Sequence, residues 1–281
     1  MESALIATDF STEAGYAVRR ASAIARETGM GGELVHVLPG SLPPERHVLA
    51  ATRAQEALAA VAEQCHADGA AFGIRLLSGS IGDELAAAAR GHDLAIAGAR
   101  GEDVLLYHFA LGRTSVRLVQ ESEHPVLVVK RAVPGPYRRV VAAVDFSPAS
   151  RAAVAFAARL APNAHFELAH AYEVMFESTL RRAGTDEETI EGYRIEAHAK
   201  ALAAMTAFAA ALPIAPQRLS TFVLRGYPPR MVLDRAEGAA DLVVLGKRSA
   251  GPVERFLLGS VALQVLELSP CDVLIVPEAP A

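Results

Sequence analysis

The chain has 281 residues, of which 52% are hydrophobic and 21% charged, and its formal net charge is −5. This length accommodates two ordinary domains with full cores, and the acidic balance argues against nucleic-acid binding, because neutralising phosphates requires a basic surface. No run of about 18 or more uncharged apolar residues occurs, so the sequence predicts no membrane-spanning segment.

Short apolar runs alternate with alanine-rich amphipathic stretches, a pattern typical of a parallel sheet covered by helices. In the first half, strands are expected near residues 3–8, 33–38, 72–77, 94–98 and 126–130, and helices near 12–28, 46–68, 80–90 and 112–121. In the second half, strands are expected near 139–145, 165–171, 217–224, 242–246 and 273–276, and helices near 149–160, 187–211, 228–236 and 259–267.

The two halves repeat one another. The first strand ends in Asp9-Phe10-Ser11, and its counterpart ends in Asp145-Phe146-Ser147. A repeat this long indicates two whole domains of one fold and not a solenoid. The sequence therefore predicts an α/β protein of two tandem five-stranded parallel open sheets with helices on both faces.

We expect the first domain over residues 1–131, a linker over 132–137 that contains two prolines and a glycine, and the second domain over 138–281. The one sizeable insertion, about 13 residues, falls in the second half between His170 and Gly226. Because it contains many charged residues, we expect a longer solvated helix and loop there in preference to a dedicated binding element.

Cys65 and Cys271 fall at unrelated places in the repeat, so we expect no shared disulfide framework and a cytoplasmic location. The nine histidines are scattered and have no cysteine partners at metal-ligand spacing, so no metal site is expected. His36 and His170 recur at matched positions, where a buried histidine at a strand end is more often structural than catalytic.

The carboxyl ends of the strands, where open α/β sheets bind ligands, carry three candidate features in each half. These are the first-strand aspartate, the end of the second strand, and a glycine-bearing loop that follows the fourth strand. Such a loop lets the backbone approach a phosphate closely, and it leads to a helix N-terminus whose free amides favour an anion. By spacing alone, ordinary turn glycines and helix caps explain these residues equally well.

These residues resemble the universal stress protein family, in tandem form. The resemblance rests on the paired Asp-Phe-Ser strand ends, the Val-His-Val and Ala-His-Ala second strands, the Asp-Leu-x-x-x-Gly fourth strands, the glycine loops and the closing Val-Leu-Val/Ile-Val strands. It covers essentially the whole chain and implies the adenine nucleotide α-hydrolase-like fold. It also implies binding of ATP, with or without Mg²⁺, on a loop of pattern Gly-x2-Gly-x9-Gly-(Ser/Thr).

Carried over by position, the resemblance implies an adenosine side and a phosphate side in each half. In the first half the implied residues are Ala7, Asp9 and Val37, then Gly98, Arg100, Gly101, Gly112, Arg113, Thr114 and Ser115. In the second half they are Ala143, Asp145 and Ala171, then Gly246, Arg248, Ser249, Gly259, Ser260, Val261 and Ala262.

Neither loop matches the family pattern fully. The first has ten residues instead of nine before Gly112, and Arg113 replaces the small hydroxyl residue, where it either blocks a phosphate or pairs with one. The second keeps the spacing but has Ser249 in place of a glycine. We expect two non-equivalent pockets, the second being the better fit.

The resemblance favours an ATP-binding stress-response or regulatory protein over an enzyme, with slow ATP hydrolysis at most, because no nucleophile stands paired with a base. The alternative is a non-nucleotide member of the family whose degenerate pockets bind another small ligand or a protein partner. An ATP pyrophosphatase is disfavoured, since the Ser-Gly-Gly-x-Asp-Ser loop of that class does not follow either first strand.

Single-domain relatives pair through their last strands, and an unpaired edge strand is a template for such pairing. With both domains on one chain, strands 126–130 and 273–276 are at high effective concentration. We therefore expect the two domains to pair within the molecule as a pseudo-dimer, with further homodimerisation possible.

Overall fold

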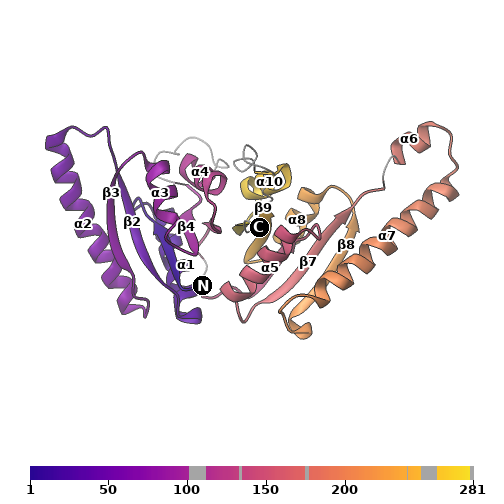
Figure 1. The fold of residues 1–281 in the computed structure, drawn as a ribbon, viewed down its shortest axis with the longest axis horizontal. Coiled ribbons are helices and arrows are strands. Elements are labelled where there is room, and N and C mark those ends of the chain that lie inside the picture. Colours follow the sequence, from indigo (N-terminus) through magenta and orange to yellow (C-terminus); the bar gives the residue numbers. More distant parts are fainter. Residues whose placement is uncertain (101–111, 133–134, 175–176, 239, 248–257, 279–281) are drawn as a thin grey trace.

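The computed structural model describes residues 1–100, 112–132, 135–174, 177–238, 240–247 and 258–278 (Figure 1). The first-half elements are β1 Ser3–Ala7, α1 Thr12–Thr28, β2 Gly31–Pro39, α2 Pro44–Ala67, β3 Gly73–Gly79, α3 Ile81–Ala89, β4 Leu94–Gly98, α4 Arg113–Glu121 and β5 Val126–Val129. The second-half elements are β6 Arg139–Ala143, α5 Pro148–Leu160, β7 His165–Tyr172, α6 Glu177–Arg182, α7 Glu187–Ala210, a short 3-10 turn Pro216–Arg218, β8 Leu219–Arg225, α8 Pro228–Glu237, β9 Leu242–Lys247, α10 Ser260–Leu268 and β10 Asp272–Pro277.

The element order confirms the predicted α/β fold, with small differences at element ends. β2 begins at Gly31 and not near residue 33, because Gly31 already pairs with Ser3 of β1. Local capping explains where α1 begins and ends. The Ser11 hydroxyl accepts a hydrogen bond from the Ala14 amide at 3.2 Å, and Gly29 ends the helix in the left-handed region at φ 75°.

All ten strands form one sheet in the order β3-β2-β1-β4-β5-β10-β9-β6-β7-β8. Pairing is parallel within each half, and β5 and β10 pair antiparallel, with Val128 opposite Val273 and Leu127 opposite Leu274. The two five-stranded sheets therefore join through their last strands, which confirms the predicted pairing of the halves within the chain.

Helices cover both faces of this continuous sheet (Figure 1). Alternate strand residues point to opposite faces, so Leu127 joins the core layer under α1, α2, α5 and α7, while Val126 and Val128 join the layer under α3, α4, α8 and α10. Each layer runs without interruption through both halves. None of the helices in the described ranges has the length and apolarity that a bilayer crossing requires.

A buried charge cluster holds the halves together at the β5–β10 junction. Arg20 of α1 donates from Nε to Asp272 of β10 at 3.0 Å, and these side chains are 2% and 0% exposed. Tyr137 donates its hydroxyl hydrogen to the same carboxylate oxygen at 2.8 Å, and the Lys130 amide donates to the other at 2.9 Å. The Arg20 guanidinium also lies 4.0 Å from the centroid of the Tyr137 ring.

This cluster has no copy on the other side of the junction. In the alignment of the halves, Phe156 stands where α1 has Arg20, and Pro125 stands where β10 has Asp272. Phe156 is buried. The junction is therefore charged on one side and apolar on the other, although the folds of the halves match.

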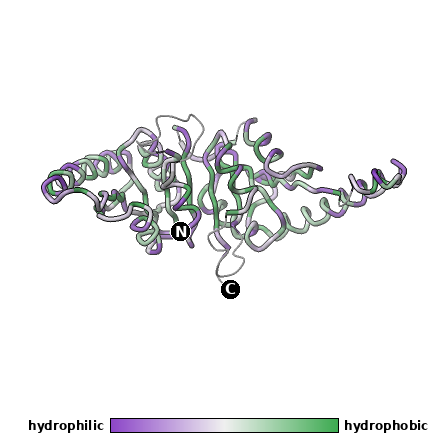
Figure 2. The backbone as a smooth tube through the Cα atoms, turned by 90° about the horizontal axis from the view of Figure 1, so that it is seen from above, coloured by the Kyte–Doolittle hydropathy of each residue, from purple (hydrophilic) through white to green (hydrophobic). Residues whose placement is uncertain are grey.

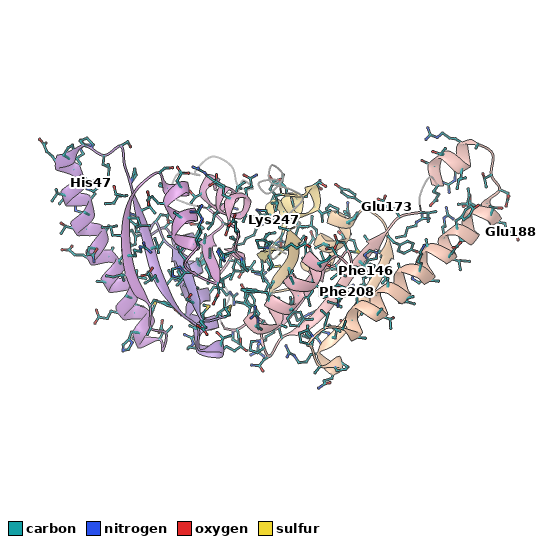
Figure 3. All side chains as sticks on the ribbon, in the orientation of Figure 1. His47, Phe146, Glu173, Glu188, Phe208 and Lys247 are labelled. Atoms are coloured by element: carbon teal, nitrogen blue, oxygen red, sulfur yellow. The ribbon has the colours of Figure 1, made fainter. Side chains whose placement is uncertain are left out.

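Two lysines connect each half to a helix of the other. Lys247, at the end of β9, donates from Nζ to the carbonyl oxygens of Val119 and Gln120 in the last turn of α4, at 3.1 and 2.5 Å. Lys130, directly after β5, donates to the carbonyl oxygens of Glu267 and Ser269 at the end of α10, at 3.2 and 2.9 Å. These bonds satisfy carbonyl groups that a helix C-terminus leaves without intrahelical partners. Figure 3 labels Lys247 near the centre of the molecule.

The inserted segment of the second half forms the separate helix α6 and the first turns of α7, which extend away from the body (Figure 2). Glu177 of α6 accepts hydrogen bonds from Arg194 of α7 at 2.5 Å and from Arg225 of β8 at 3.1 Å. Glu188 lies near the tip of this arm (Figure 3).

Replacing Asp272 with alanine is expected to lower the free energy of unfolding by about 3–5 kcal/mol, because Arg20 would keep a buried charge without its carboxylate. Urea unfolding followed by circular dichroism measures the change. The matched control, Asp272→Ala combined with Arg20→Met, removes both charges and should be more stable than Asp272→Ala alone. An Asp272→Ala protein as stable as the wild type would contradict this account of the junction.

Burial lowers the pKa of Lys130 to about 8, from its usual 10.5. Above pH 8 the unfolded chain still binds a proton that the folded protein has released, so the contribution of Lys130 to the free energy of unfolding rises with pH. Between about pH 8 and pH 9 we expect the wild type to gain about 1 kcal/mol relative to Lys130→Met, as measured by urea unfolding at each pH. A constant difference over this interval would show that Lys130 titrates normally.

Candidate functional site

The first strand of each half ends in a strained corner. Phe10 and Phe146 have φ angles of 65° and 64°, in the left-handed region that residues with side chains seldom adopt. Such strain costs free energy and concentrates at functional sites. Its presence at the same position in both halves marks the Asp-Phe-Ser corner as the feature around which each site is built.

A histidine of the second strand supports each corner. Nδ1 of His36 lies 2.8 Å from the Thr8 carbonyl oxygen, and Nδ1 of His170 lies 2.8 Å from that of Val144. A carbonyl oxygen only accepts, so Nδ1 of each ring carries the proton and donates. The Phe146 ring packs on His170 with centroids 4.2 Å apart, and Phe10 packs on His36 at 4.6 Å. These contacts give the histidines a structural role.

The strand-end aspartates are held by the helices that follow them. Oδ1 of Asp9 accepts from the Ser11 amide at 3.0 Å, and Oδ1 of Asp145 accepts from the Ser147 amide at the same distance. The Ser147 hydroxyl also donates to Asp145 at 2.5 Å and accepts from the Ser150 amide as the α5 cap. Each carboxylate is therefore fixed at the carboxyl edge of the sheet.

The glycines that end β4 and β9 are required by packing. A Cβ atom on Gly246 would lie 2.6–2.7 Å from backbone atoms of Ala149 and Ser150, and one on Gly98 would lie 2.9 Å from the backbone of Glu13. Gly259, at the N-cap of α10, differs, because a Cβ there would meet nothing within 4 Å among the described residues. Of these three predicted glycines, Gly98 and Gly246 are thus required by packing, and Gly259 has no described neighbour that would exclude a side chain.

A cavity of about 480 Å³ opens at the carboxyl edge of the second half. Eight of the predicted residues line it: Ala143, Asp145, Ala171, Gly246, Gly259, Ser260, Val261 and Ala262. The predicted Arg248 and Ser249 lie outside the described residues. Its volume falls in the range of pockets that bind small molecules, about 300–1,000 Å³.

One wall of this cavity and a buried lysine in its lining were not indicated by the sequence patterns. Pro228, Met231 and Val232 of α8 form an apolar wall, and Lys247, whose Nζ donates to carbonyl groups of α4, also belongs to the lining. Burial lowers the pKa of Lys247, while Glu123 raises it. The position of α8, directly after a strand end at this edge, was the available signal, as was a lysine ending the otherwise apolar strand β9.

The first half arranges the matching residues differently. The Ser115 hydroxyl, predicted as a phosphate donor, is buried and donates inward to the Gly98 carbonyl oxygen at 2.6 Å. The aligned position in the second half is Ala262. Glu84 stands where the second half has Met231, so the α3 wall carries a carboxylate in place of an apolar side chain.

The remaining first-half residues are spread over several elements. Ala7 and Val37 are buried, Asp9 is half-buried, and Gly112 is the N-cap of α4, its amide donating to the Ala99 carbonyl oxygen at 2.8 Å. Thr114 is half-buried in the first turn of α4, and Arg100 follows β4 closely. Gly101 and the side chain of Arg113 lie outside the described residues.

The fold and the repeated corners define a tandem α/β protein with a ligand-sized cavity at the strand ends of its second half. The family model described as the universal stress protein family matches residues 1–130 and 136–277. The chain therefore belongs to the universal stress protein family, with one family domain in each half.

Known proteins agree with this assignment. A Thermus aquaticus protein, named as a universal stress protein in the QAH/OAS sulfhydrylase 3′ region, is 33% identical over 151 residues, which are 50% of this chain and 98% of that protein. The crystal structure of a universal stress protein from Archaeoglobus fulgidus has a TM-score of 0.73 at 21% identity and covers 98% of both chains. A functionally unknown protein from Pseudomonas aeruginosa has a TM-score of 0.67 at 21% identity, over 99% of this chain and 93% of that one.

Replacing Gly246 with alanine is expected to lower the free energy of unfolding by about 1–3 kcal/mol, because the new methyl group must displace the start of α5. Gly259→Ser is the matched control, since Gly259 has room for a side chain and serine is a good N-cap. Its free energy of unfolding should stay within about 0.5 kcal/mol of the wild type in the same urea titration. An equal loss of unfolding free energy in the two variants would contradict the conclusion that packing requires a glycine at position 246 and not at position 259.

Proposed function

We propose that the protein binds an adenine nucleotide, ATP in the first instance, in the cavity of the second half. The observation that carries this proposal is that the eight described second-half residues implied by the family resemblance all surround one cavity. They come from four separate parts of the chain, so only the folded protein brings them together.

The cavity has two chemically different walls, which suit the two ends of a nucleotide. Met231 and Val232 of α8 give an apolar wall for a planar base, and Asp145 is placed as an acceptor for polar groups of the nucleoside. Elsewhere in the lining, Gly259 and the first residues of α10 present helix N-terminal amides, which favour phosphate oxygens. The space at Gly259 lets a phosphate approach the backbone.

The first half is proposed to bind nucleotide more weakly or to have another role. The Glu84 carboxylate replaces Met231, an apolar residue of the wall proposed for the base, and the Ser115 hydroxyl already donates to the Gly98 carbonyl oxygen. These two residues favour a reshaped first-half pocket, for another small ligand or a protein partner.

We propose binding, with at most slow hydrolysis, as the activity of the second site. Fast hydrolysis needs a base positioned to activate water. Among the described residues lining the cavity, Asp145 is held by the Ser147 cap, and His170 donates from Nδ1 to the Val144 carbonyl oxygen and packs on Phe146, so Nε2 is the one nitrogen of this ring left to accept a proton. Among the described residues, no group of three His, Cys, Asp or Glu side chains is placed to hold a metal ion, so Mg²⁺ would enter with the nucleotide phosphates.

Mass spectrometry of small molecules released from the purified protein, together with ATP calorimetry, tests the proposal. Gly259→Val should weaken ATP binding by about tenfold or more, because the side chain fills the phosphate position, a loss of about 1.4 kcal/mol. Gly112→Val is the matched control at the N-cap of α4 and should leave the affinity within about twofold. Thermal melting checks that both variants fold. The proposal is contradicted if the wild type releases no adenine nucleotide and also gives no heat of ATP binding.

A further inference from the structure

Helix α10 has its two ends in two different environments. Its N-terminus, from Gly259 to Ala262, forms a wall of the second-half cavity. Its C-terminal carbonyl groups, at Glu267 and Ser269, accept hydrogen bonds from Nζ of Lys130, which belongs to the first half. The helix has nine residues, so these ends are about 13 Å apart.

The helix supplies no cation of its own for the negative end of its dipole. Its last turn contains no basic residue and does contain Glu267, whose negative charge is unfavourable at a helix C-terminus. The Lys130 ammonium donates hydrogen bonds to the terminal carbonyl groups and places a positive charge near the Glu267 carboxylate. Lys130 is not among the described residues that line the cavity, and α10 connects its Nζ to the cavity wall.

The junction between the halves fixes where this ammonium lies. The Lys130 amide donates to Asp272, whose carboxylate is also held by Arg20 and Tyr137. Around Nζ, the negative or ionisable groups are Cys271, directly before β10, Asp272 of β10 and Glu267 of α10, and the positive group is Arg100, which follows β4. The cation is thus held by the same contacts that join the two halves.

We propose that Lys130 of the first half is a positioning residue of the second-half nucleotide site, acting through α10. This inference rests on the proposed function of that cavity. A cation at the C-terminus of a short helix strengthens the field that its N-terminal amides present to an anion, and it holds the last turn against fraying. The expected contribution is about two- to fivefold in affinity for a phosphate-bearing ligand.

The arrangement also makes binding depend on pH. Burial lowers the pKa of Lys130 to about 8, so the ammonium loses its charge within an ordinary working range. Burial raises the pKa of Cys271, so this thiol stays neutral over the same range. The advantage that Lys130 gives to ATP binding should therefore be present near pH 7 and disappear toward pH 9.

The test uses ATP calorimetry on the full-length wild type, Lys130→Met, Lys130→Arg and Lys200→Met at about pH 7 and about pH 9. Lys200 is exposed on α7, so its variant removes the same charge from a surface remote from α10. At pH 7, Lys130→Met should bind ATP about threefold more weakly, while Lys130→Arg and Lys200→Met match the wild type. At pH 9, the wild type and Lys130→Met should bind ATP with the same affinity. Lys130→Arg, which stays charged, should still bind ATP more tightly than Lys130→Met.

Hydrogen exchange of the nucleotide-free proteins gives a readout that needs no ligand. The amides of the last turn of α10 should exchange faster in Lys130→Met than in Lys130→Arg, because only arginine can still bond the carbonyl groups. If the wild type binds ATP and Lys130→Met binds it equally well at pH 7, the inference fails and the proposed function stands. If the wild type binds no ATP, both fail.

Discussion

The molecule depends on the antiparallel pairing of β5 with β10. Each of these strands is the last of its own half and would otherwise be an open edge, so their pairing turns two five-stranded sheets into one and lets the core layers on both faces continue. The Arg20–Asp272 pair stabilises one side of the β5–β10 junction. A buried ion pair contributes little net stability, yet it is costly to leave half-made, so it specifies which surfaces must meet.

The β5–β10 junction is connected to both candidate sites through helices α4 and α10. Lys247 and Lys130 each leave a strand end near the junction and bond the last carbonyl groups of a helix in the other half. The N-terminus of α10 lines the second-half cavity, and the N-terminus of α4 is at the corresponding place in the first half. Each half therefore depends on a lysine of the other half to bond the end of one of its helices, even though each has the complete family fold.

Sequence patterns predict the fold well because they depend on neighbouring residues and occur in both halves of the chain. Alternating apolar strands, serine caps and glycine stops place the elements within a few residues, and the repeat gives the pairing of the last strands. The contacts that the sequence could not predict are long-range and not periodic: Arg20 and Asp272 stand at opposite ends of the chain, and the two buried lysines reach across the β5–β10 junction. Ser115 shows the limit for the site, because a hydroxyl at a helix start has the same sequence signature whether it faces a phosphate or a strand carbonyl.

The charged side and the apolar side of the β5–β10 junction show what becomes possible when both halves belong to one chain. In a dimer of two identical chains, every interface residue appears twice, so an arginine introduced on one side is introduced on both. Here the positions aligned with Arg20 and Asp272 are Phe156 and Pro125, and each member of the pair is present once. Joining the halves in one chain frees the interface from twofold symmetry, so that a residue on one side of the junction can change without a matching change on the other.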